Sequence, residues 1–296
     1  MNKFRDLIVE NIEEAKLVLV GLPYDGSCSV GKGASIAPKT LRDLSGYLPA
    51  YTMDKESIED FKIYDFGDIE VSNDYHCKVE KITKLVFELN KFPLFLGGDH
   101  SVSIPLQKNF IELSKKKGLT PVIIHIDAHP DICDVYDDSK FSHACTNMRT
   151  IENGCETCNI NLIGIRGFEK QEVEYFKMHK EINLYLASEI NEKGFEYIIE
   201  ELITKYSDPK YVCYLSYDID ANDPSFAPGT GTPEAFGLDS YKLMKFIKTL
   251  FKKLNIAAMD IVEVSPPLDV NNITSWLALK TLYEIFAVLN EKLKES

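Results

Sequence analysis

Apolar residues recur along this chain in short runs, separated by stretches whose apolar positions follow the spacing of a helix. The runs are rich in Val, Ile, Leu, Phe and Tyr and predict buried strands at Leu17–Pro23, Phe61–Asp68, Phe92–Gly98, Pro121–Ile126, Ile160–Ile165, Ile182–Ala187, Tyr211–Tyr217 and Ile256–Val264. Amphipathic stretches between them predict helices, for example Tyr75–Leu89, Val102–Lys116, Phe195–Tyr206 and Ser240–Leu254. This alternating order predicts an α/β protein with a mostly parallel sheet that is covered on both faces.

About eight strands are compatible with a closed (β/α)₈ barrel or with an open, doubly wound sheet. Both architectures place their chemistry at the carboxyl ends of the strands. No linker, internal repeat or shift in composition divides the sequence, so we expect a single domain over residues 1–296.

Composition and charge exclude several classes of function. A formal net charge of −13 argues against nucleic-acid binding, which needs clustered Lys and Arg. The apolar stretches are too short to cross a bilayer, and the first residues are acidic where a secretory signal is apolar, so we expect a cytoplasmic protein. Seven cysteines indicate free thiols, and the pair Cys155 and Cys158 lacks the second half of a zinc site.

Polar side chains that bind metals follow four of the predicted strands. His100 follows the first of these strands within the sequence Gly-Gly-Asp-His-Ser, and Asp127, His129 and Asp131 follow the next. Alternate residues of extended backbone project to the same side, so these last three residues are expected to converge on one ion. His125 is interpreted as a core or supporting histidine.

A second acidic pair, Asp218 and Asp220, follows the strand at Tyr211–Tyr217, and Glu263 lies at the end of the last strand. The six candidate ligands are therefore four carboxylates and two imidazoles, from His100, Asp127, His129, Asp131, Asp218 and Asp220. Carboxylates crowded together raise each other's pKa unless cations neutralise them, and two divalent ions would do so. This oxygen-rich set with two imidazoles favours Mn²⁺, with two ions sharing a water that they activate as a nucleophile.

With these motifs in place, the chain resembles the ureohydrolase family, which includes arginase, agmatinase, guanidinobutyrase and formimidoylglutamase. The similarity runs from Gly21–Asp25 through the three ligand segments to Asp260–Pro267. The resemblance implies one three-layer α/β/α domain around a parallel sheet of about eight strands. It thereby favours the open sheet over the barrel.

The resemblance also implies a role for each site residue. His100 and Asp131 are expected to bind one Mn²⁺, His129 and Asp220 the other, and Asp127 and Asp218 both. Hydroxide held between the ions would attack the guanidinium carbon, and urea and an amine would leave. Glu263 would pair with the guanidinium, Asp131 would stabilise the intermediate, and His143 would pass a proton to the leaving amine. Thr232, in the loop after Asp220, is a further candidate substrate contact.

The loop sequence favours agmatine as the substrate, giving putrescine and urea. Between Asp131 and His143 the chain has three Asp and one Lys, which disfavours a substrate carboxylate, and Cys133 replaces the Asn of arginases. Glu169 and Glu172 are candidates for holding the terminal amine. The open alternatives are another ureohydrolase, a deacetylase-like amidohydrolase with one Zn²⁺, and a silent binding protein. The family resemblance further implies a homo-oligomer, a trimer or hexamer.

Overall fold

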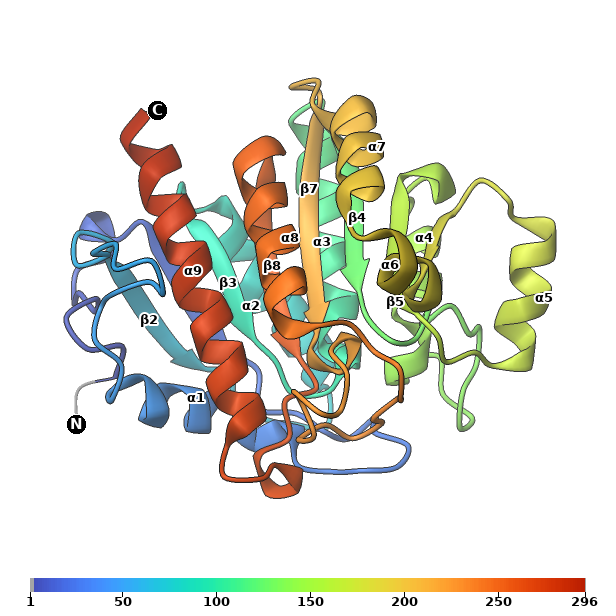
Figure 1. Ribbon diagram of the computed structural model, residues 1–296, viewed down its shortest axis with the longest axis horizontal. Helices are drawn as coiled ribbons and strands as arrows, with labels where there is room; N and C mark the ends of the chain where they lie inside the picture. The colour runs from blue at the N-terminus through green and yellow to red at the C-terminus, as the bar shows by residue number, and fades with distance from the viewer. Residues whose placement is uncertain (1–2, 296) are drawn as a thin grey trace.

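The computed structural model describes residues 3–295, and its centre is one eight-stranded sheet in which every strand pair is parallel (Figure 1). In chain order the strands are β1 (Leu17–Gly21), β2 (Ile63–Asp68), β3 (Phe92–Leu96), β4 (Thr120–Ile126), β5 (Ile160–Ile165), β6 (Asn183–Leu186), β7 (Tyr211–Asp218) and β8 (Ile256–Val262). Their order across the sheet is β2-β1-β3-β8-β7-β4-β5-β6. The two edge strands, β2 and β6, do not pair with each other, so the sheet is open and doubly wound as the family resemblance implied.

Helices cover both faces of this sheet and complete three layers. The α-helices are α1 (Ala37–Ser45), α2 (Tyr75–Glu88), α3 (Ser103–Lys116), α4 (Thr146–Glu152), α5 (Lys170–Met178), α6 (Ala187–Lys193), α7 (Glu196–Tyr206), α8 (Ser240–Lys253) and α9 (Ile273–Glu295). In Figure 1, α7, α8 and α9 lie in front of the sheet, while α2 and α3 lie behind it. The predicted α/β class and the predicted sheet are confirmed.

The strands are continuous apolar runs because both of their faces are buried. In β4, Val122 and Ile124 belong to the core on the α7–α9 side, whereas Ile123 belongs to the core on the α2–α3 side. Alternate residues of a strand point to opposite faces, so a strand between two helical layers needs apolar residues at every position. This is why the sequence located the strands to within a few residues.

The predicted helices agree with α2, α3, α7 and α8 to within one residue at each end. The sequence analysis gave no account of α9, the 23-residue helix that packs against α1 and α8. Its start is fixed by Asp269, whose carboxylate accepts the backbone N–H groups of Thr274 and Ser275, each at 3.0 Å.

A buried ion pair holds α1 against the edge strand β2. The guanidinium of Arg42 donates two hydrogen bonds of 2.8 Å to the carboxylate of Asp65 and a further one to Asp68. Only 3% of the Arg42 side chain is exposed, so its charge depends on these carboxylates.

All seven cysteines are free thiols, Cys155 and Cys158 among them. Within residues 3–295, none of the helices combines the length and the apolar character that crossing a membrane requires.

Candidate metal centre

The strand order places the predicted ligands next to one another. Strands β3, β8, β7 and β4 are consecutive in the middle of the sheet, and all four end at the same edge because they are parallel. His100 follows β3, the Asp127–Asp131 segment follows β4, Asp220 follows β7, and Glu263 follows β8. Residues that lie far apart in the sequence therefore meet at the carboxyl ends of neighbouring strands.

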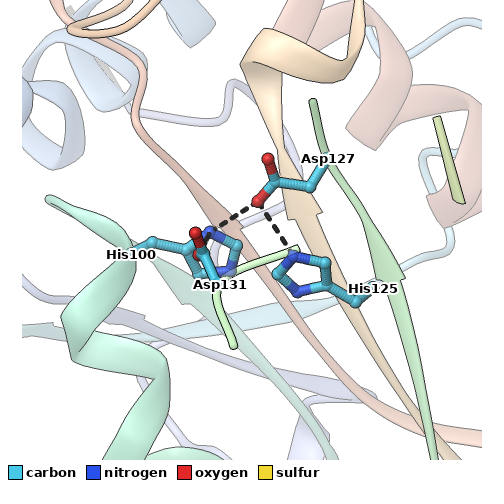
Figure 2. Close-up of side chains that lie close together, drawn as sticks. All are labelled: His100, His125, Asp127 and Asp131. Carbon is cyan, nitrogen blue, oxygen red and sulfur yellow. Dashed lines mark ion pairs between the residues drawn. The ribbon is translucent and has the colours of Figure 1, made fainter. Parts of the chain in front are cut away.

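The first group of side chains surrounds His100. Its Nδ1 atom lies 2.9 Å from Oδ2 of Asp127 and 3.1 Å from both Oδ2 of Asp131 and Oδ2 of Asp218. Figure 2 shows the carboxylates of Asp127 and Asp131 turned toward the imidazole. All four residues are buried, so three carboxylate oxygens converge on one nitrogen away from bulk water.

The second group surrounds His129. Its Nδ1 atom lies 3.1 Å from Oδ2 of Asp220 and 3.5 Å from Oδ1 of Asp127. The two oxygens of Asp127 therefore face the two groups, Oδ2 toward His100 and Oδ1 toward His129. Asp127 can therefore contribute one oxygen to each of the two groups.

The segment after β4 reaches this arrangement by a turn and not by extended backbone. β4 ends at Ile126, and Asp131 has a φ of 51°, a left-handed conformation that a side chain disfavours. Asp127 and Asp131 consequently approach His100, while His129 approaches Asp220. The expectation that all three would converge on a single ion through the alternation of a strand was wrong, because the strand stops before the first of them.

Glu263 shares this unusual backbone, with a φ of 61°. Its Oε1 atom accepts the backbone N–H of His100 at 2.8 Å, and its own N–H donates to the carbonyl of Gly98 at 2.9 Å. The fold thus holds Asp131 and Glu263 in costly conformations at the same sheet edge, as is common for residues in functional sites.

The glycines before His100 are required by close approach. A Cβ atom at Gly98 would overlap the carbonyl oxygen of Tyr24, and one at Gly97 would lie 2.5 Å from Cγ1 of Val262. The chain therefore passes between the Tyr24 loop and β8, and this passage presents His100 to the carboxylates.

The electrostatics of the cluster are those of a site made for cations. Burial raises the pKa of Asp131 and of Asp218 well above the usual range, and Asp127 raises both further. Burial also acts to raise the pKa of Asp127, but the imidazoles of His125, His100 and His129 hold it well below its usual value. Burial lowers the pKa of His100, whereas Asp127 and Asp131 raise it to about 10. Without cations the cluster retains protons on some of its groups.

These residues fit divalent metal ions. Oδ2 of Asp127 is buried and has no hydrogen-bond partner among the described residues, although two imidazoles lie near it. Two sets of side chains bring their ligand atoms within 4.8 Å of one another, His100, His125, Asp127 and Asp131 in one and Asp127, His129 and Asp220 in the other. A donor set of carboxylates and imidazoles around a buried carboxylate oxygen suits Mn²⁺ or a similar ion.

A hydrogen-bond chain that the sequence analysis did not identify fixes the orientation of His100. Oγ of Ser216 lies 2.9 Å from Nε2 of His100 and donates to Oδ1 of Asp260 at 2.7 Å. Nε2 therefore carries the proton, which leaves the Nδ1 lone pair free for a metal. Ser103 and Tyr214 also donate to Asp260, at 2.6 and 2.7 Å. Asp260 and Ser216 could both be located in the sequence, next to Glu263 and Asp218, but the sequence did not show that they contact each other.

His125 is a supporting residue of the same cluster. Its ring stacks on that of His100 with centroids 4.7 Å apart, and its Nε2 atom lies 3.0 Å from Oδ2 of Asp127 (Figure 2). It is fully buried. This position agrees with the interpretation of His125 as a core or supporting histidine.

A cavity of about 370 Å³ opens above the cluster. Its floor includes His100, His129, Asp131 and Asp218, and His143 and Thr232 lie in its wall. Nδ1 of His143 lies 3.4 Å from Oε1 of Glu263, and its Nε2 lies 3.0 Å from Oγ of Ser29. Oγ1 of Thr232 lies 3.4 Å from Oδ2 of Asp220. The cavity thus gives a small molecule access to the cluster.

Glu169 and Glu172 line this cavity, and both already have structural partners. They form a capping box at the start of α5, in which each side chain accepts a backbone N–H of the other residue. Glu172 also accepts the N–H of Ile132 at 3.0 Å and is buried. Their binding of a substrate amine stays a prediction.

Comparisons with known proteins agree with this geometry. The model of the arginase family matches residues 15–287. The agmatinase of Bacillus cereus is 32% identical over 93% of this chain and 92% of that protein, and the guanidinobutyrase of Pseudomonas aeruginosa is 30% identical over 91% and 85%. The crystal structure of an agmatine ureohydrolase of Thermoplasma volcanium has a TM-score of 0.87 and 32% identity, and the match covers 100% of this chain and 96% of that one. The family resemblance is confirmed: the chain belongs to the arginase family, and it is a hydrolase acting on guanidino groups.

Proposed function

We propose that this protein is an agmatinase, which hydrolyses agmatine to putrescine and urea with two Mn²⁺ ions per chain. The observation that carries the choice of substrate is the charge of the cavity wall. The acidic residues that line it are Asp131, Glu169, Glu172, Asp218 and Glu234. Neither Lys nor Arg is among the described residues that line it. A cationic tail is favoured there, and the carboxylate of arginine or of 4-guanidinobutyrate is disfavoured.

The ligands divide between two positions. His100 and Asp131 would hold one ion, His129 and Asp220 the other, and Asp127 and Asp218 would face both. The contacts of Asp127 with both imidazoles support this division. When bound, the two ions supply positive charge that brings the pKa of a shared water near neutrality and makes a nucleophile available.

The remaining residues orient the substrate and move protons. Glu263 is proposed to pair with the guanidinium, and Asp131 to stabilise the tetrahedral carbon after water adds to it. His143 would donate a proton to the amine nitrogen as the C–N bond breaks. Burial lowers the pKa of His143, whereas Glu263 and Asp99 raise it, and the net shift is upward, which favours the protonated form that this step needs. Thr232 is proposed to hold the guanidinium edge beside Asp220.

A substrate panel tests the proposal. Purified protein loaded with Mn²⁺ would be assayed for urea release from agmatine, arginine and 4-guanidinobutyrate. We expect kcat/KM to be highest for agmatine, and a preference for either of the others would overturn the argument from cavity charge. Two Mn²⁺ per chain are expected by elemental analysis, whereas a single Zn²⁺ would favour a deacetylase-like hydrolase.

The organisation of the protein in solution and in the cell is also proposed. We expect one domain over residues 1–296, a cytoplasmic location, no nucleic-acid partner, and a homotrimer or homohexamer. Native mass measurement of the purified protein tests the oligomeric state.

A further inference from the structure

The cavity contains a carboxylate whose role the sequence analysis did not address. Glu234 lines the cavity wall together with Glu169 and Glu172. The other two side chains already accept backbone N–H groups in the capping box of α5. Within residues 3–295 the carboxylate of Glu234 makes one ion pair, with Nε2 of His129 at 3.8 Å, and 44% of its side chain is exposed. Its carboxylate is therefore accessible to a ligand in the cavity.

Arg166 holds the backbone at Glu234 in place through hydrogen bonds to carbonyl groups. The guanidinium of Arg166 donates to the carbonyl of Glu234 at 2.8 Å, to that of Ala235 at 3.1 Å and to that of Asp220 at 2.7 Å. One cation thus ties the Glu234 segment to a metal-ligand segment. An anchored backbone limits the positions that the Glu234 side chain can occupy, which lowers the entropy that it loses on binding.

The side chain of Glu234 is confined as well. A Cβ atom built on Gly167 would lie 3.3 Å from Cγ of Glu234 and 2.6 Å from Cδ2 of His129. Glu234 and His129 therefore pack side by side over the bare backbone of Gly167. The carboxylate of Glu234 lies at the Nε2 edge of the His129 imidazole, opposite the Nδ1 edge that faces Asp220.

Glu234 and the metal-ligand carboxylate of Asp220 lie at opposite edges of the His129 ring. Nδ1 of His129 faces Asp220, and the Glu234 carboxylate lies beyond the opposite edge of the ring, 3.8 Å from Nε2. The guanidinium carbon of agmatine is separated from its terminal nitrogen by six bonds, which span roughly 7.5 Å when extended, since three backbone bonds span about 3.8 Å. An extended substrate whose guanidinium lies at the cluster therefore carries its terminal nitrogen along the cavity wall, which Glu234 lines.

We propose that Glu234 is a specificity-determining residue that pairs with the terminal ammonium of an alkylguanidine substrate. This inference rests on the proposed function for the reaction at the guanidinium end. It names the substrate class as alkylguanidines with a cationic tail, and it gives Glu169 and Glu172 a structural role at the start of α5.

The test is Glu234→Gln, measured against three substrates that differ only in the tail. All three carry a guanidino group on a chain of three methylenes, which ends in a protonated aminomethyl group in agmatine, a methyl group in butylguanidine and a carboxylate in 4-guanidinobutyrate. We expect the variant to lower kcat/KM for agmatine about tenfold, mainly through KM, as the loss of one partly exposed charge pair. The value for butylguanidine should stay unchanged, and that for 4-guanidinobutyrate should rise.

Glu192→Gln is the matched control, because it removes the same charge from an exposed residue of α6 that does not line the cavity. It should leave all three substrates unaffected. An equal loss on all three substrates in Glu234→Gln would show that Glu234 acts through His129, and no loss on agmatine would show that it does not recognise the tail. Either result overturns the proposal.

Failure of the proposed function is distinguishable from failure of this inference. If the unaltered protein releases urea from none of these compounds, the proposed reaction is wrong. Binding of agmatine and butylguanidine to the Mn²⁺-loaded protein, measured by calorimetry, still tests Glu234. We expect Glu234→Gln to weaken the binding of agmatine alone, and an unchanged affinity for agmatine would overturn the inference independently of turnover.

Discussion

Ser216→Ala is expected to weaken Mn²⁺ binding without touching a metal ligand. Oγ of Ser216 is the partner of Nε2 of His100 and one of three donors to Asp260. Both Ser216 and His100 are buried, so water cannot replace the lost hydroxyl without rearrangement. The alanine variant therefore leaves an N–H without an acceptor in the core.

The size of the effect follows from that unpaired group. A buried donor without a partner costs about 1–3 kcal/mol. Since the metal-bound state needs the imidazole in this orientation, most of the cost should appear as reduced affinity, and removal of such a supporting partner typically weakens metal binding 10- to 100-fold. We expect a loss of about 2 kcal/mol in Mn²⁺ binding free energy, which is roughly 30-fold in affinity.

Ser103→Ala provides the matched control. Ser103 also donates to Asp260, at 2.6 Å on the other oxygen, but it has no hydrogen bond to His100. Mn²⁺ affinity would be measured for both variants by competition with a chelating indicator, and the thermal midpoint of the metal-free proteins by calorimetry. Both variants should lose similar stability, but only Ser216→Ala should lose affinity. Equal Mn²⁺ affinities in the two variants would refute the role assigned to Ser216.

Three further outcomes are expected. Chelation should lower the thermal midpoint, and more so at pH 8 than at pH 6. The pKa of His100 is raised to about 10, and those of Asp131 and Asp218 are also raised, so the metal-free fold binds protons more tightly than the unfolded chain and its stability falls as pH rises over this range. Metal binding releases those protons. An equal Mn²⁺-induced shift at both pH values, by scanning calorimetry, would contradict this. His143→Ala should lower kcat about 100-fold. Its Mn²⁺ content should be unchanged, because His143 contacts Glu263 and no metal ligand. A drop in metal content would count against the proton-transfer role. Arg42→Ala should cost about 3 kcal/mol in urea-induced unfolding, since Asp65 loses its buried partner, and a loss below 1 kcal/mol would mean that this pair is neutral.

The sequence by itself determined the elements and the candidate ligands. Strands buried on both faces must be apolar throughout, so their positions were visible as runs such as Thr120–Ile126 within two residues of the prediction. The short acidic and histidine-rich segments directly after those runs were equally visible. These are local features, and local patterns are what a sequence displays.

Only the tertiary structure decided which of these residues meet. The placement of β8 and β7 between β3 and β4 brings His100 within 3.1 Å of Asp218, and no local pattern specifies pairing between strands so distant in the chain. The turn after β4 places His129 beside Asp220. Strand alternation had instead predicted that His129 would bind the same ion as Asp127 and Asp131.

The tertiary structure also decided the contacts of Ser216, Glu172 and Glu234. The hydrogen bonds of Ser216, accepted from His100 and donated to Asp260, join segments that the sequence separates by 116 and 44 residues. Glu172 and Glu234 are the same type of residue. The side chain of Glu172 takes part in the capping box of α5, whereas Glu234, whose backbone carbonyl accepts from Arg166, lines the cavity. A carboxylate's role depends on which donors the fold brings to it, and those contacts exist only once the chain has folded.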